Sequence, residues 1–111
     1  MNVLKGVLEE ELENSKRIKR QYGEALRKLP KGSIQEKEIR GHRYLYLVLR
    51  KDGKVKLEYI GKKENVEKNE IEKYIKAKKL RKKYIKLRSE ANKQVAFLER
   101  ILNGRELRSV S

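Results

Sequence analysis

The dipeptide Asp-Gly at 52–53 lies between two segments in which residues alternate, RYLYLVLR at 43–50 and KVKLEYI at 54–60. Alternation with a period of two is typical of strands, and Asp-Gly is a preferred loop of antiparallel hairpins. A third short strand is predicted for SIQEKEI at 33–39. Connections as short as these join antiparallel neighbours. The sequence therefore predicts a three-stranded antiparallel meander over residues 33–61.

Two loop geometries compete in this hairpin, and they exchange the faces on which the side chains lie. A two-residue loop pairs Lys51 with Lys54, whereas a three-residue loop with a bulge at Gly53 pairs Arg50 with Lys54. The residues that would share a face with Val55, Leu57 and Tyr59 are Tyr44, Tyr46 and Val48 in the first case and Leu45, Leu47 and Leu49 in the second. We favour the bulged loop, because it gathers six apolar side chains that gain about 1.5–3 kcal/mol each on burial.

Two long helices are predicted on either side of the meander, over residues 2–29 and 65–102. Both carry apolar residues at steps of three and four, which is the spacing of one helical face. In the first helix these residues are Leu4, Leu8, Leu12, Ser15, Ile18, Tyr22, Ala25 and Leu29. In the second they are Ile71, Tyr74, Ala77, Leu80, Tyr84, Leu87, Ala91, Val95, Leu98 and Leu102. Their mean step in the second helix is close to that of a coiled coil, so we expect the helices to pack antiparallel through these stripes.

The predicted fold is α+β, a long antiparallel helical hairpin with an inserted three-stranded meander, in one domain over residues 1–111. A frayed tail is expected at 103–111. At about 1.5 Å per residue, the second helix exceeds the first by about a dozen residues. An uncovered apolar patch of that size usually finds a partner. We therefore expect a homodimer through the end of this helix, at Val95, Phe97, Leu98, Ile101 and Leu102.

The net charge is +15, from 31 basic and 16 acidic residues, and such a field attracts polyanions. Residues 73–88 contain nine cations and no carboxylate. Like charges at helical steps of three and four repel each other, and a phosphate backbone would relieve that repulsion. Two alternatives are a Lys-rich thermophile composition and a solvated face. In the second alternative, the first helix packs antiparallel on the second and supplies carboxylates to its cations. These carboxylates are Glu9, Glu10 and Glu13, which would come near Lys83, Lys86 or Arg88.

These observations predict a nucleic-acid-binding protein, with DNA favoured over RNA. Lysine and arginine would neutralise phosphates, and tyrosine rings on the outward sheet face would stack on bases. The predicted contact residues are Arg43, Tyr44, Tyr46, Arg50, Lys54, Lys56, Lys76, Lys79, Lys82, Lys83 and Lys86. The rival interpretation is a structural or adaptor protein whose long helix pairs with another chain and whose lysines only aid solubility. A separate alternative for Arg50 is that it pairs with Asp52 and braces the turn instead of binding a partner.

The segment LPKGSIQEKEIRGHRYLYLVLRKDGKVKLEYIGKK at 29–63 carries a recognisable pattern. Its elements are Leu-Pro-x-Gly-Ser-Ile, Gly-x-x-Tyr-x-Tyr, Arg50, Gly-Lys-Val and Tyr-Ile-Gly-Lys. The pattern resembles a family of small uncharacterised prokaryotic proteins in which a long charged helix follows. It is also similar to the β-stranded N-terminal regions of some transposases and integrases. That second similarity implies a sheet that docks on DNA, and it assigns no catalytic residue here.

The sequence offers no sign of catalytic or metal chemistry. It has no cysteine, and its one histidine, His42, cannot build a metal site alone. No nucleophile or phosphate-loop motif is present, so we expect no enzyme activity and no cofactor. No apolar run approaches the ~20 residues of a membrane span, and the N-terminus does not read as a signal peptide. We therefore expect a cytoplasmic protein without a membrane partner.

Overall fold

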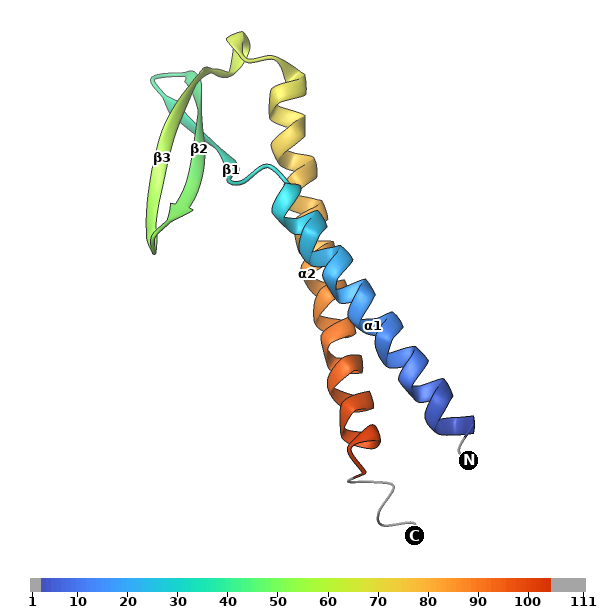
Figure 1. The fold of residues 1–111 in the computed structure, drawn as a ribbon. Helices are drawn as coiled ribbons and strands as arrows, with labels where there is room; N and C mark the ends of the chain where they lie inside the picture. The colour runs from blue at the N-terminus through green and yellow to red at the C-terminus, as the bar shows by residue number, and fades with distance from the viewer. Residues whose placement is uncertain (1–2, 105–111) are drawn as a thin grey trace. The chain divides into compact units, whose positions relative to one another are not determined.

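The computed structural model describes residues 3–104 and confirms the α+β fold with its helix–strand–strand–strand–helix order (Figure 1). Its elements are α1 (Val3–Lys28), β1 (Ser33–Ile39), β2 (His42–Lys51), β3 (Lys54–Lys62), the 3-10 helix η1 (Lys63–Asn65) and α2 (Lys68–Leu102). Helix α2 begins three residues later than predicted, because η1 forms a separate turn and Val66 after it is extended. The tail predicted at 103–111 lies outside the described residues from position 105 onward.

The chain divides into two compact units, which are described separately here. The helical unit comprises Met1–Lys28 and Lys83–Ser111, and the sheet unit comprises Leu29–Lys82. Helix α2 belongs to both units, its first half to the sheet unit and its second half to the helical unit.

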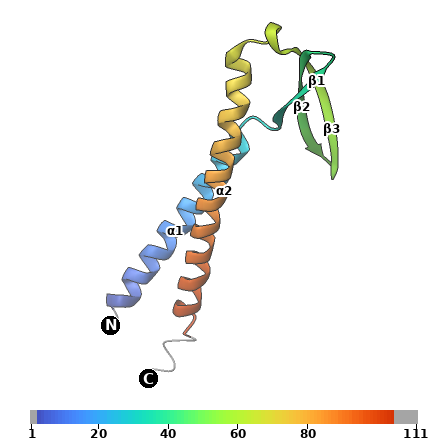
Figure 2. The ribbon, with the colours of Figure 1, turned by 180° about the vertical axis from the view of Figure 1, so that it is seen from behind.

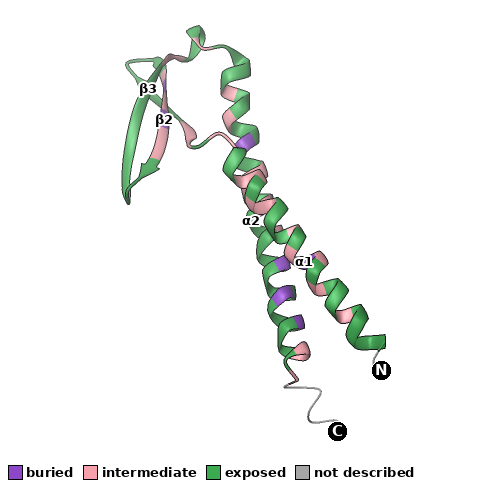
Figure 3. Ribbon diagram, in the orientation of Figure 1, coloured by how far each residue is buried: buried purple, intermediate pink, exposed green. Residues whose placement is uncertain are grey.

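In the helical unit, α1 lies beside the second half of α2 and runs in the opposite direction, in both views (Figures 1 and 2). The buried residues are Ser15 on α1 and Ala91, Val95 and Leu98 on α2 (Figure 3). The rings of Tyr22 and Tyr84 contact each other, with centroids 5.7 Å apart. The predicted apolar stripe of α2 is confirmed, because all ten of its residues are buried or half-buried.

This packing corrects the surface that we expected for a homodimer. Val95 and Leu98 are only 8% and 3% exposed, so they lie in the core of the helical unit and not in an uncovered overhang. Of the five predicted contact residues, Phe97 is exposed and Ile101 and Leu102 are half-buried. A dimer through the end of α2 would therefore have to use these three residues.

The sheet unit contains the meander in the order β1-β2-β3, with both pairs of strands antiparallel as predicted. The predicted register of the hairpin is wrong. Lys51 pairs with Lys54, so the loop is the two-residue Asp52-Gly53. Both loop residues have positive φ, 53° and 75°, which is the type I′ turn that Asp-Gly favours. The burial argument failed because β3 does not turn its apolar residues inward: Val55 and Tyr59 are 60% and 58% exposed.

The register gives the sheet two chemically different faces. The leucine face consists of Ile34, Glu36, Glu38, Arg43, Leu45, Leu47, Leu49, Lys51, Lys54, Lys56 and Glu58. The tyrosine face consists of Ser33, Gln35, Lys37, Ile39, His42, Tyr44, Tyr46, Val48, Arg50, Val55, Leu57, Tyr59 and Lys62. Leu45 and Leu47 are buried, so the leucine face is the one that contributes to the core of the sheet unit.

The segment between α1 and β1 fits closely against β2. Gly32 has a φ of 97°, and a Cβ placed there would lie 2.9 Å from Leu47, from Leu49 and from the carbonyl oxygen of Val48. The guanidinium of Arg81 on α2 donates a hydrogen bond to the carbonyl of Pro30 in the same segment. These contacts explain the Pro-x-Gly spacing, since only glycine allows this backbone conformation at this distance.

Candidate nucleic-acid interface

The tyrosine face carries a cluster of three aromatic rings. The ring centroids of Tyr46 and Tyr59 are 5.5 Å apart, and those of Tyr44 and Tyr59 are 6.3 Å apart, with interplanar angles of 56° and 47°. The ammonium of Lys37 lies over the Tyr46 ring, 5.1 Å from its centroid. Ile39 and the three tyrosines line a shallow pocket of about 300 Å³. The cluster is open, with Tyr44 and Tyr46 half-buried and Tyr59 exposed.

Sequence reasoning predicted Tyr44 and Tyr46 for this face but missed Tyr59. The error followed from the register, because the bulged loop placed Tyr59 on the inner side. The same correction applies to Lys54 and Lys56, which belong to the leucine face and do not lie beside the tyrosines. The signal that would have identified Tyr59 is Asp-Gly itself, whose preferred two-residue loop pairs Tyr59 with Tyr46.

Charge is distributed unequally between the two faces of the sheet. All three carboxylates of the strands, Glu36, Glu38 and Glu58, belong to the leucine face. The tyrosine face carries the cations Lys37, Arg50 and Lys62 and no carboxylate. Arg50 is exposed and forms no ion pair within residues 3–104, so it does not brace the turn through Asp52. The tyrosine face is therefore both aromatic and positively charged.

The predicted contact residue Arg43 lies on the leucine face, where its guanidinium is 3.6 Å from the carboxylate of Glu36. The ammonium of Lys63 is 2.9 Å from the same carboxylate. The hydrogen bond from Lys63 lowers the pKa of the Glu36 carboxyl below its usual value of 4.5, and the charges of Lys63 and Arg43 add to this effect. Glu36 thus links strand β1 to β2 and to η1.

The Glu36 ion pairs make the stability of the protein pH-dependent. Because the folded-state pKa is lowered, their contribution is present above about pH 4.5 and is lost as the pH falls through the folded-state pKa. We expect E36Q to have a lower melting temperature than the wild type at pH 7. Between about pH 5 and pH 3, the melting temperature of E36Q should fall by less than that of the wild type. Circular dichroism at several pH values measures both effects. E38Q, which removes an exposed carboxylate on the same strand, is the control, and equal pH profiles for E36Q and wild type would contradict the prediction.

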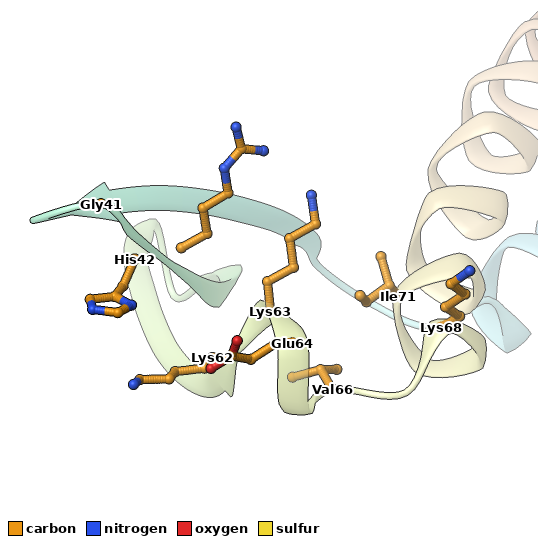
Figure 4. A pocket seen from close by; sticks show the side chains of 9 residues that line it. Gly41, His42, Lys62, Lys63, Glu64, Val66, Lys68 and Ile71 are labelled. Carbon is orange, nitrogen blue, oxygen red and sulfur yellow. The ribbon is translucent and has the colours of Figure 1, made fainter.

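A larger pocket of about 580 Å³ lies where the β1–β2 turn, the end of β3, η1 and the start of α2 meet (Figure 4). It is lined by Gly41, His42, Arg43, Lys62, Lys63, Glu64, Val66, Lys68 and Ile71. Figure 4 shows the side chains of Lys63 and Lys68 extending to the same side, with Ile71 between them. Four cations and one carboxylate line this pocket, but Arg43 and Lys63 already pair with Glu36. Lys62 and Lys68 are therefore the cations of the lining that form no ion pair among residues 3–104. Sequence reasoning missed Lys62, Lys63 and Lys68, although the run YIGKK placed two of them directly after a strand.

The basic stretch 73–88 is helical throughout. Lys73 approaches Glu70 at 4.0 Å, and Arg81 bonds to the Pro30 carbonyl. The other seven cations are exposed and form no ion pair among the described residues: Lys76, Lys78, Lys79, Lys82, Lys83, Lys86 and Arg88. The alternative in which glutamates of α1 neutralise them is wrong for residues 3–104, since Glu13 pairs instead with Lys16 of its own helix at 3.8 Å.

Within residues 3–104, no group of three or more histidine, aspartate or glutamate side chains is arranged to hold a metal ion. In the same part of the chain, no helix combines the length and the apolar character needed to cross a bilayer.

The fold and its surfaces define a class of protein, an α+β chain whose short antiparallel sheet has one open aromatic face and whose long helix is strongly basic. The sequence model of a family described as a domain of unknown function, DUF6788, matches residues 8–70. The match covers more than half of the chain, and the protein therefore belongs to this family, which confirms the resemblance to an uncharacterised family. Searches of curated proteins and of solved structures gave no match.

Proposed function

We propose that this protein binds nucleic acid without catalysing a reaction. The basic side chains of α2 contact phosphates, and the tyrosine face of the sheet contacts bases or sugars. DNA is the favoured polymer, because the meander is similar to the N-terminal regions of some transposases and integrases. The cytoplasm of a prokaryotic cell is the location we propose, because the meander resembles that of small prokaryotic proteins.

The observation that carries this proposal is the set of seven exposed cations on α2 that have no ion-pair partner among residues 3–104. A helix that concentrates like charges loses a few tenths of a kcal/mol for each neighbouring pair. Carboxylates would be expected to interleave if these lysines served only to keep the protein in solution. A polyanion relieves the repulsion, and it gains entropy through the release of its counterions.

Binding to labelled oligonucleotides at two salt concentrations tests the proposal. If five phosphates are contacted, counterion release predicts that the affinity falls about 100-fold or more between 50 and 200 mM salt. Fluorescence anisotropy with a 20-nucleotide single strand, the matching duplex and the matching RNA measures this dependence. An analogue with an uncharged backbone is the control and should not show it. Absence of binding near 100 mM salt would contradict the proposal.

The rival candidate is an adaptor that associates with another chain through its long helix. Ile75, Ile85 and Phe97 favour it, because these large apolar residues of α2 are exposed. This rival predicts a second protein chain on α2 and no salt-dependent binding of oligonucleotides, so the same titrations separate the two candidates.

A further inference from the structure

We infer that the tyrosine face is a stacking platform for unpaired bases, so that the preferred substrate is single-stranded nucleic acid rather than a duplex. This inference rests on the proposed function and adds the class of substrate. It assigns the central role to Tyr59, whose ring contacts those of both Tyr44 and Tyr46.

The geometry of the three rings suits successive bases of one strand. Tyr59 is 58% exposed although it belongs to a sheet, and it lies between two half-buried tyrosines that support it. The rings are tilted by 47° and 56° and are not stacked on each other, so part of each ring surface is left for a ligand. Stacking of bases on such rings tolerates any sequence, because every base has a π-face.

The positive charge of the tyrosine face favours a polyanion as its ligand. Lys37 lies over Tyr46, Arg50 follows on the same face, and no carboxylate of the strands belongs to it. A second copy of the chain packed face to face would bring these cations against their own equivalents, since such a contact places the same patch on both subunits. An acidic polymer with aromatic bases matches both the charge and the rings.

A duplex does not offer what this face recognises. Its base faces are stacked on each other, and exposing one costs a few kcal/mol of unstacking. A single strand presents its bases without that cost. The lysines of α2 need only phosphates and bind either form, so the sheet is the part of the protein that distinguishes them.

The variant Y59L tests the inference, because it keeps an apolar side chain on an exposed strand but removes the ring. We expect Y59L to bind a labelled 12-nucleotide oligo(dT) about 10-fold more weakly than the wild type does at 100 mM salt. Its affinity for a 12-base-pair duplex should equal that of the wild type. Y59F keeps the ring and should bind like wild type. F97L removes an exposed ring of the helical unit and is the matched control. Quenching of tyrosine fluorescence in the wild type by oligo(dT) gives a second readout that needs no variant, since the chain has six tyrosines and no tryptophan.

The outcomes separate this inference from the proposed function. Weaker oligo(dT) binding by Y59L alone, with quenching in the wild type, supports the inference. Unchanged oligo(dT) binding by Y59L, or preference of the wild type for the duplex, overturns it and leaves the proposed function intact. If the wild type binds no nucleic acid, both fail. Self-association that depends on Tyr59 in sedimentation velocity, without an effect on oligo(dT), also overturns the inference.

Discussion

The triple variant K76Q/K79Q/K83Q should bind nucleic acid about 100-fold more weakly than the wild type at 150 mM salt. The three lysines recur at steps of three and four on α2, are exposed, and form no ion pair among residues 3–104. Each lost phosphate contact lowers the slope of log K against log salt by about 0.7–0.9. Anisotropy titrations over a range of salt concentrations measure the affinity and the slope together.

A matched control is available in the variant K16Q/R27Q/K73Q, which removes the same number of charges from the net +15. Its three cations already pair with Glu13, Glu24 and Glu70 of their own helices. We expect this control to keep most of the affinity. Equal losses in the two variants would show that net charge alone determines binding and would contradict a role for the exposed row on α2. Melting temperatures should not fall in the test variant, because it removes repulsion between lysines.

The substitution G32A should destabilise the protein by about 2–4 kcal/mol, the sum of a positive-φ cost and an overpacking cost. Gly32 has a φ of 97°, and an added Cβ would meet two leucine side chains and a backbone carbonyl oxygen at 2.9 Å. The leucines can yield by rotation, but the Val48 carbonyl is held in the sheet. Thermal unfolding followed by circular dichroism should show a melting temperature about 10 °C lower or more.

The control for this prediction is G23A. Gly23 lies inside α1, and a Cβ built on it has nothing within 4 Å. Alanine is the better helix former, so we expect a gain of about 0.5–1 kcal/mol. The same chemical change should thus have opposite effects at the two positions. A G32A protein as stable as the wild type would show that the segment before β1 does not pack on β2 as described.

The helices could be predicted from sequence because their apolar residues repeat with a period that only a helix places on one face. The stripe of α2, from Ile71 to Leu102, is buried or half-buried at every predicted position. The start of α2 was harder to predict, because the 3-10 turn η1 and the extended residue Val66 separate β3 from the helix. Local hydrogen bonds decide such a boundary, and they leave little trace in hydrophobic spacing.

The register of the hairpin was predicted wrongly because two principles gave opposite answers. The count of apolar residues favoured a bulged loop, whereas the dipeptide Asp52-Gly53 favoured a type I′ turn. The count assumed that Val55, Leu57 and Tyr59 are buried, and the structure leaves all three exposed. An apolar residue on an edge strand is weak evidence that its side chain is buried. A dipeptide that readily adopts two positive φ angles, such as Asp-Gly, is stronger evidence, because it favours the two-residue loop directly.

The candidate site was predicted only where one element carries it. The basic residues of α2 follow from helical spacing alone, and Tyr44 and Tyr46 follow from alternation on one strand. The pocket at the β1–β2 turn combines Arg43, Lys63 and Lys68 from three elements. Tyr59 joins the tyrosines through the pairing of two strands. Such combinations depend on register and on the path of loops, which a pattern along the chain does not specify.

Helix α2 is continuous from Lys68 to Leu102, and its row of lysines without an ion pair among residues 3–104 extends past the middle of the helix. Local fraying of the helix at that point would divide the row into two shorter pieces with fewer phosphates each. A polymer that binds the whole row favours the continuous helix over the frayed one, by mass action. A bound strand would therefore raise the free energy that fraying of the helix requires.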